Sequence, residues 1–164
     1  LLGGDIFIDS EEGKGSVFRF TIPNEQVETT FYEPVIQTTI DKELNWSEKT
    51  ILVAEDEEYN FLLINEVVKK TGVKIVWAKD GLEAVELFGK QHVDLVLMDI
   101  KMPNMDGFEA TVKIKEMNSK VPVIAQTAFA MTDEKEKSFE AGCDGYLAKP
   151  IKPRELLITI SQFF

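Results

Sequence analysis

Hydrophobic residues recur in two patterns along this chain, and the pattern changes near residue 49. Beyond that point, short apolar runs alternate with longer segments in which apolar residues recur every three or four positions. Short apolar runs are typical of buried strands, and the longer period is typical of amphipathic helices. The pattern predicts strands at residues 50–54, 73–77, 93–98, 121–126 and 144–148.

The segments between and after these strands have a helical pattern. A mostly charged fourth helix is predicted over 132–141, and Pro153 is tolerated in the first turn of the last helix. Strands that alternate with helices predict βαβ units and a parallel sheet. We therefore expect a doubly wound α/β domain over residues 49–164. The last helix is expected to bury Leu156, Leu157 and Ile160. The residues that recur at helical spacing in the first three helices are Phe61, Ile64, Val68, Ala84, Val85, Phe88, Phe108, Thr111, Ile114 and Met117.

The first 48 residues have a different pattern. Apolar residues alternate with polar ones on both sides of a glycine loop at 10–15, which predicts a β-hairpin within residues 1–23. A lone hairpin is marginally stable in water, so this one should need a partner surface. Residues 24–48 are polar and lack a clear period, which is typical of a linker.

Composition narrows the function classes. The net charge is −11, with 29 acidic against 18 basic residues, which argues against nonspecific binding of nucleic acid or anionic membranes. The single cysteine, Cys143, excludes an internal disulfide and favours a reducing, cytoplasmic compartment. No apolar run approaches about 18 residues, so no membrane span is expected. The chain opens Leu-Leu-Gly-Gly, so we expect it to begin in mid-protein.

Acidic residues follow two of the predicted strands. Glu55 and Asp56 come after the first strand, and Asp99 follows the third. Ligands of open parallel sheets bind outside the carboxyl ends of the strands, so these side chains are expected in one crevice. Three carboxylates in one crevice repel each other unless a hard cation lies between them. The pattern therefore predicts a Mg²⁺ site, with the backbone carbonyl of Lys101 as a further ligand.

Asp99 is the candidate nucleophile. A carboxylate can attack phosphorus and form an acyl phosphate. Lys149, after the fifth strand, would place its ammonium on a phosphoryl oxygen, and Thr127, after the fourth, would donate its hydroxyl. Tyr146 on the last strand is either a switch residue or a core aromatic. Taken alone, Asp99 and Thr127 are also common residues at strand ends, and the acids after residue 54 also suit the start of a helix.

The order and spacing of four motifs resemble a response-regulator receiver domain of bacterial two-component signalling. The motifs are ILVAED at 51–56, MDIKMPNMDG at 98–107, QTA at 126–128 and GYLAKP at 145–150. The resemblance implies a flavodoxin-like sheet in the order 2-1-3-4-5, for which a member of this family is a standard example. It also implies Mg²⁺-dependent phosphorylation of Asp99 by a phosphohistidine, followed by a shift of Thr127 and Tyr146.

Residues 1–23 resemble the last hairpin of a histidine-kinase ATPase domain. The shared pattern is two glycines, alternating apolar residues, a Gly-x-Gly-Ser turn and two phenylalanines. The resemblance implies a hybrid sensor histidine kinase as parent, with its own kinase domain or a histidine phosphotransfer protein as partner. This chain lacks the family's ATP-binding boxes and its phosphorylatable histidine, so we do not expect it to bind ATP.

Two other functions compete with a phosphorelay receiver. A magnesium phosphohydrolase could use Asp99, the acid pair and Lys149 with an aspartyl-phosphate intermediate. The Asp-x-Asp pattern of haloacid-dehalogenase-like phosphatases is missing, which weighs against it. A degenerate receiver that acts only as an interaction module is the other alternative. The apolar strands near the N-terminus could also pair, edge to edge, with those of a second copy and so form a dimer.

Overall fold

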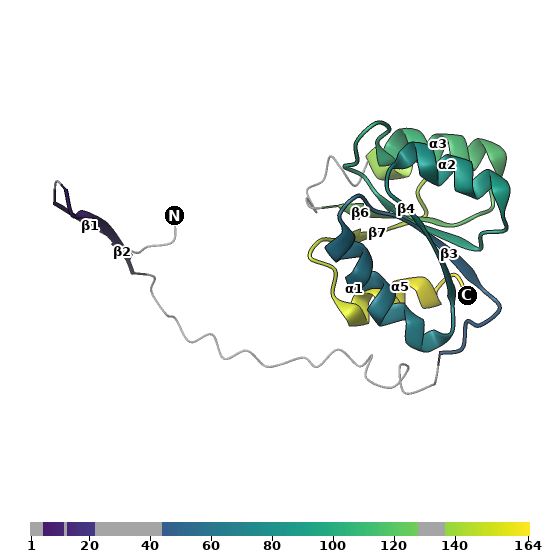
Figure 1. The fold of residues 1–164 in the computed structure, drawn as a ribbon, viewed down its shortest axis with the longest axis horizontal. Coiled ribbons are helices and arrows are strands. Elements are labelled where there is room, and N and C mark those ends of the chain that lie inside the picture. The colour runs from purple at the N-terminus through teal and green to yellow at the C-terminus, as the bar shows by residue number, and fades with distance from the viewer. Residues whose placement is uncertain (1–4, 12, 22–43, 128–136) are drawn as a thin grey trace. The chain divides into compact units, whose positions relative to one another are not determined.

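The computed structural model describes residues 5–11, 13–21, 44–127 and 137–164. The chain divides into two compact units, with the boundary between Thr38 and Thr39. Figure 1 shows a β-hairpin in the first unit and a layered α/β fold in the second. We describe each unit by itself.

The larger unit is built on a five-stranded sheet. Its strands run in the order β4-β3-β5-β6-β7, and every neighbouring pair is parallel. Numbered within this unit, the order is 2-1-3-4-5, which confirms the predicted flavodoxin-like topology. The strands are β3 (Thr50–Ala54), β4 (Lys74–Ala78), β5 (Leu95–Asp99), β6 (Val123–Thr127) and β7 (Gly145–Ala148).

Helices cover both faces of this sheet (Figure 1). The helices α1 and α5 pack together on one face, and α2 and α3 pack together on the other. Residues 137–140 are also helical, and the rest of the predicted fourth helix lies outside the described residues. The bounds are α1 (Glu58–Val68), the 3₁₀ turn η1 (Lys69–Thr71), α2 (Gly81–Lys90), α3 (Gly107–Met117) and α5 (Pro153–Ser161).

Alternate strand residues point to opposite faces and build two core layers. Ile51, Leu97 and Ile124 belong to the layer that contains α1 and α5 residues. Their sequence neighbours Leu52 and Met98 belong to the layer on the other face. Each central strand is therefore buried on both sides, as is expected for a parallel sheet covered by helices.

Four of the five predicted strands begin too early, and in the last of them the strand starts at Gly145 rather than at residue 144. The apolar runs start at Val73, Val93 and Val121, but the strands start one or two residues later. These valines are only 8%, 5% and 3% exposed, because they pack into the core before the ladder begins. Apolar runs therefore mark burial more closely than they mark strand bounds.

Aspartates set the starts of two helices. The carboxylate of Asp80 accepts a hydrogen bond from the Glu83 backbone N–H at 2.8 Å, and that of Asp106 accepts one from Glu109 at 2.9 Å. Such caps satisfy backbone donors that a helix leaves unpaired in its first turn. They fix where α2 and α3 begin, close to the carboxyl edge of the sheet.

The segment before β3 packs against the larger unit, although the sequence pattern suggested a linker up to residue 48. Trp46 is only 6% exposed and belongs to the core layer beneath α1 and α5. Its ring meets Phe164 edge-on, with the ring centroids 5.2 Å apart. The chain therefore joins this fold at least four residues before its first strand.

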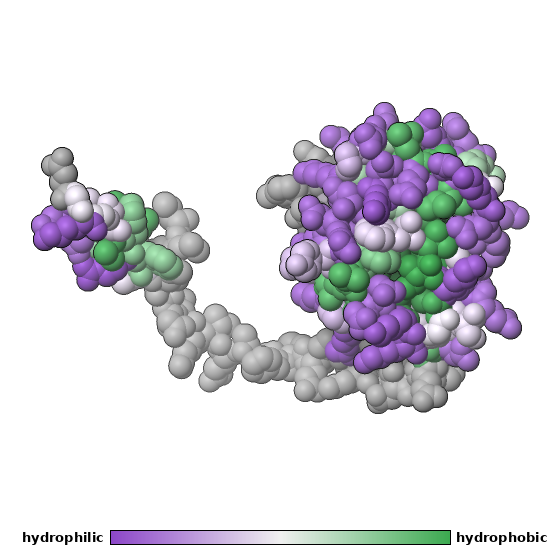
Figure 2. Space-filling model, viewed as in Figure 1, coloured by the Kyte–Doolittle hydropathy of each residue, from purple (hydrophilic) through white to green (hydrophobic). Residues whose placement is uncertain are grey.

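The smaller unit is an antiparallel hairpin of β1 (Ile6–Glu11) and β2 (Gly15–Phe20). Ile6 pairs with Phe20, and Ile8 pairs with Phe18, so one face is apolar. These four side chains are 60–75% exposed. In Figure 2 the hairpin carries green, hydrophobic surface beside purple, hydrophilic surface.

Candidate functional site

Three carboxylates meet at the carboxyl edge of the sheet. Glu55 follows β3, and Asp99 ends the adjacent parallel strand β5. One oxygen from each of Glu55, Asp56 and Asp99 lies within 4.8 Å of the others. Glu55 is fully buried, Asp99 is 5% exposed and Asp56 is open to solvent. The parallel register of β3 and β5 thus brings together acids that are more than forty residues apart.

Lys149 lies between two of these carboxylates. Its Nζ donates to Glu55 Oε2 at 2.7 Å and to Asp99 Oδ2 at 2.6 Å. The Lys149 backbone N–H donates to the carbonyl of Thr127 at 2.7 Å, which extends the pairing of β6 and β7. The Lys149–Pro150 peptide bond is cis.

Burial and pairing act in opposite directions on these charges. Burial raises the pKa of Glu55 above its ordinary value, although hydrogen bonds from Lys149 and Asn60 partly offset that effect. Burial also works to lower the pKa of Lys149, but its hydrogen bonds to Asp99 and Glu55 outweigh it and raise that pKa. Lys149 is therefore held as an ammonium ion in the crevice.

Glu55 has further partners that sequence analysis missed. Asn60 Nδ2 donates to Glu55 Oε1 at 2.8 Å, and Trp77 Nε1 donates to the Glu55 backbone carbonyl at 2.8 Å. The Trp77 ring stacks on Phe61 of α1, with centroids 4.2 Å apart and planes 3° from parallel. No local motif signals Trp77, because its contact depends on β4 lying beside β3.

The loop after Asp99 is closely packed. The Lys101 backbone N–H donates to Asp99 Oδ1 at 3.2 Å. A Cβ at Gly107 would lie 2.1 Å from the Asp99 carbonyl oxygen, so only glycine fits there. Asn104, which has a φ of 63°, donates through Nδ2 to Asp80 Oδ2 at 2.7 Å. The Asn104–Asp80 hydrogen bond fastens the loop after Asp99 to the start of α2.

Thr127 and Tyr146 lie on the two strands beyond Asp99. Thr127 ends β6 and is 3% exposed, whereas Tyr146 on β7 is 37% exposed. Tyr146 pairs with Ala125, two residues before Thr127. The alternation of strand side chains therefore places Thr127 and Tyr146 on the same face of the sheet. Ala128 lies outside the described residues.

The donor set fits a hard divalent cation. Three carboxylates share the crevice, and Lys149 is the ammonium that the structure pairs with two of them. The remaining negative charge would be repulsive without a further cation. Mg²⁺ prefers carboxylate and carbonyl oxygens and keeps several waters, which suits an acidic site with one exposed member, Asp56.

The fold and this acidic edge define the class of the larger unit as a flavodoxin-like signalling domain. The sequence profile described as "Response regulator receiver domain" matches residues 51–161. The chain therefore belongs to the response-regulator receiver family. Membership places it in two-component phosphorelay signalling and does not favour the phosphohydrolase alternative.

Two curated relatives represent different contexts for this domain. Sensor protein EvgS of Escherichia coli K12 is 36% identical over 160 residues, which is 97% of this chain and 13% of that protein. The response regulator DivK of Brucella ovis is 36% identical over 117 residues, which is 70% of this chain and 95% of that protein. The chain thus spans only a small part of EvgS but nearly all of DivK.

Solved structures agree with the fold. The receiver domain of sensor histidine kinase PA1611 from Pseudomonas aeruginosa, which has a magnesium ion coordinated in its active-site cleft, is 34% identical with a TM-score of 0.66. That match covers 70% of this chain and 96% of the other. A chain of the Saccharomyces cerevisiae complex between phosphotransfer protein Ypd1 and the Ssk1 receiver is 26% identical with a TM-score of 0.67, covering 70% and 88%.

None of the helices in the described ranges is long and apolar enough to cross a bilayer.

Proposed function

We propose that Asp99 accepts a phosphoryl group from a phosphohistidine and so relays a signal. The observation that carries this proposal is the position of its carboxylate, which shares a crevice with Glu55 and Asp56 and bonds to Lys149. An Asp99 oxygen attacks phosphorus, the P–N bond to the imidazole breaks, and its electron pair stays on the imidazole nitrogen. The product is an acyl phosphate on β5.

Glu55, Asp56 and Asp99 would hold Mg²⁺, together with the Lys101 backbone carbonyl. When bound, the ion would neutralise charge on the incoming phosphoryl group and orient it. Glu55 is kept in place for this role by Asn60 and by the indole of Trp77. The magnesium ion coordinated in the PA1611 receiver supports this assignment.

Lys149 and Thr127 would complete the phosphoryl site. Phosphorylation adds about −1.5 to −2 charge units at neutral pH. The Lys149 ammonium, which already contacts Asp99, is placed to pair with a phosphoryl oxygen. Thr127 would donate its hydroxyl to another oxygen, and Tyr146 on the same sheet face would follow it. Phosphorylation would then bias an existing two-state equilibrium rather than build a new shape.

A partner protein must bring its histidine to this edge, and α1 offers an apolar surface beside it. Tyr59, Leu62 and Leu63 are 86%, 44% and 42% exposed. The helix begins at Glu58, two residues after Asp56, so this surface adjoins the acidic crevice. The yeast Ypd1–Ssk1 complex is a precedent for such a partner. We assign the partner as a histidine phosphotransfer or histidine-kinase domain.

The parent protein is, in this proposal, a hybrid sensor histidine kinase with this domain in the cytoplasm. Residues 1–23 would be the end of its ATPase domain, 24–48 a linker and 49–164 the receiver. The alignment to sensor protein EvgS supports this, because it covers 97% of this chain. The apolar hairpin face would be covered by the ATPase domain, or in this chain by a second copy.

Phosphodonor labelling tests the central claim. Acetyl phosphate with Mg²⁺ should add one phosphoryl group to the intact chain, mapped to the peptide that contains Asp99. Asp99→Asn should abolish the mass shift, and Asp56→Asn should weaken Mg²⁺ affinity strongly. Label that persists on Asp99→Asn would contradict the assignment of the acceptor.

A further inference from the structure

Gln126 is a buried polar residue that the proposed chemistry leaves unused. It is fully buried in β6, and neither its Oε1 nor its Nε2 has a hydrogen-bond partner in the described part of the chain. A buried amide without partners carries its full desolvation penalty, whereas an apolar side chain of similar shape would not. An amide at this position would recover that penalty in a state of the protein that supplied it with partners.

Its place in the sheet indicates which state that is. Gln126 is the register partner of Asp99 on β5 and of Leu147 on β7. Paired residues of parallel strands project from the same face, and the strands lie roughly 4.8 Å apart. Ile124, two residues earlier, packs in the same core layer as Leu97, which is two residues before Asp99. The amide therefore lies on the Asp99 face of the sheet, beside the acceptor.

We propose that Gln126 is a positioning residue for the phosphorylated state, an inference that rests on the proposed function of Asp99. Its Oε1 would accept a hydrogen bond from the Lys149 ammonium, and its Nε2 would donate to Asp99. Because the amide would gain partners only after phosphoryl transfer, its desolvation penalty falls on the unphosphorylated state. Gln126 thereby shifts the two-state equilibrium toward the phosphorylated form.

The hydrogen-bond capacity of the site supports this assignment. In the described state Lys149 donates to Glu55 and Asp99, and an ammonium has three N–H groups. When a phosphoryl group occupies Asp99, Lys149 must turn toward its oxygens and leave part of its present pairing. A neutral amide can then serve both the ammonium and the carboxylate without adding charge to a site that already holds three acids.

Gln126→Met tests the inference, because methionine has a similar length and no amide. The probe is beryllium fluoride with saturating Mg²⁺, which mimics a phosphoryl group on a carboxylate. Without the probe, the full-length variant should resist urea at least as well as the wild type. Its affinity for beryllium fluoride should fall about tenfold, the factor expected from one or two net hydrogen bonds.

Ile124→Met is the matched control. It alters packing on the same strand and face but removes no amide. Its urea stability should change equally with and without the probe, so its affinity for beryllium fluoride should match the wild type. In ¹⁵N spectra of the wild type, the side-chain amide signals that Gln126→Met lacks should shift when the probe is added.

The outcomes separate this inference from the function on which it rests. Equal affinity in Gln126→Met and wild type would overturn the role of Gln126 alone. If the variant does not fold, the wild type alone decides. Side-chain amide signals that do not shift when beryllium fluoride is added would then overturn the role of Gln126. A wild type that does not bind beryllium fluoride would overturn the assignment of Asp99, and this inference with it.

Discussion

The hairpin and the α/β unit use strands in opposite ways. Every residue of β1 and β2 is exposed, whereas every residue of β3, β5 and β6 is buried. Both regions are rich in Ile, Val and Phe or Leu, so composition does not separate them. The α/β unit covers its strands with its own helices, whereas the described residues of the first unit, 5–11 and 13–21, include no helix. Apolar content therefore shows that burial of a segment is favourable, but not whether this chain itself buries it.

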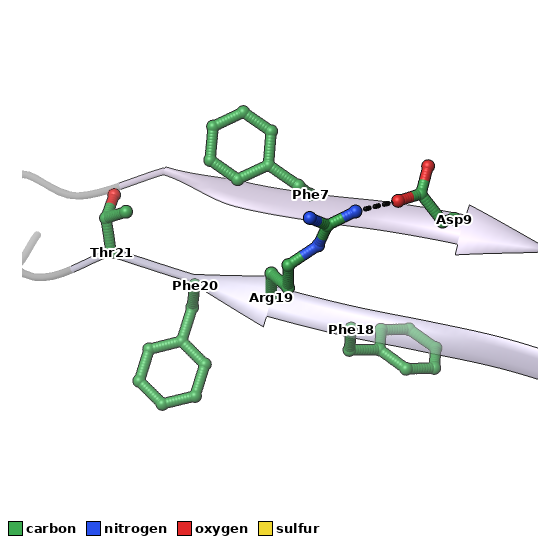
Figure 3. A pocket seen from close by; sticks show the side chains of 6 residues that line it. All are labelled: Phe7, Asp9, Phe18, Arg19, Phe20 and Thr21. Atoms are coloured by element: carbon green, nitrogen blue, oxygen red, sulfur yellow. Dashed lines mark hydrogen bonds and ion pairs between the residues drawn. The ribbon is translucent and has the colours of Figure 1, made fainter.

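A depression on the hairpin surface shows how exposed its side chains are. It is lined by Phe7, Asp9, Phe18, Arg19, Phe20 and Thr21. In Figure 3 the Arg19 side chain reaches across the strands to Asp9, while the rings of Phe7 and Phe20 point away from the hairpin on opposite sides. An exposed ion pair of this kind contributes little to stability. Isolated, the hairpin has few contacts to hold it.

Separating the two units should have the largest effect on structure, and it should fall on the hairpin alone. A peptide of residues 1–23 should lose its hairpin in water, because two strands without a covering layer are marginally stable. A fragment of residues 44–164 should unfold cooperatively with the same midpoint as the full chain. Circular dichroism and urea titration measure both, and a stable free hairpin would break the comparison.

Truncation of one apolar residue in each unit sharpens the contrast. Leu97→Ala in β5 should lower the free energy of unfolding by about 3 kcal/mol, because it leaves a cavity in a fully buried layer. Phe18→Ala removes a larger side chain, but one that is 68% exposed. It should change the unfolding of the α/β unit by less than about 0.5 kcal/mol. Equal losses would mean that the hairpin shares the core.

Trp77→Phe tests whether the core holds the acidic site in place. Phenylalanine keeps the stacking on Phe61 but removes the indole N–H that binds the Glu55 carbonyl. We expect a loss of about 1.5 kcal/mol in stability and roughly fivefold weaker Mg²⁺ binding by calorimetry. The control, Trp46→Phe, lies in the core near Phe164 and should leave Mg²⁺ affinity unchanged. Unaltered affinity in Trp77→Phe would argue against a positioning role.

Replacing Asp94 or Asp9 by asparagine should change stability least, and the effect at Asp94 should depend on pH. Burial works to raise the pKa of Asp94, but hydrogen bonds from Thr50, Lys49 and His92 outweigh it and lower that pKa below its ordinary value. A carboxyl whose pKa is lower in the folded state stabilises the fold above its unfolded pKa, and loses that effect as pH falls through the folded pKa.

Asp94→Asn should therefore lower the free energy of unfolding by about 1 kcal/mol at pH 7. This difference from the wild type should shrink as the pH falls below about 4. Asp9→Asn removes an exposed partner of Arg19 in the hairpin. It should not alter the unfolding of the α/β unit, either at pH 7 or below about pH 4. Urea titrations at several pH values measure both variants. A penalty for Asp94→Asn that stays constant with pH would contradict the role of its charge.

Local periodicity predicted the strands and a parallel sheet, and the resemblance to receiver domains implied the strand order. The meeting of the three acids was predicted from where ligands bind such sheets. Sequence analysis could not find Trp77, Asn60 or Gln126. Their contacts depend on which strands lie side by side and on side-chain positions that no motif records. It also placed four strand starts too early and extended the linker to residue 48, in most cases because burial begins before the ladder does. The chemical roles of Asp99, Thr127 and Lys149 stay predictions until phosphorylation is measured.

The edge-on contact between Trp46 and Phe164 brings the segment before β3 next to the residues after α5. A domain whose entrance and exit adjoin can be inserted into, or removed from, a longer polypeptide without moving the segments on either side. Adjacent ends thus suit this fold to a place within a longer polypeptide.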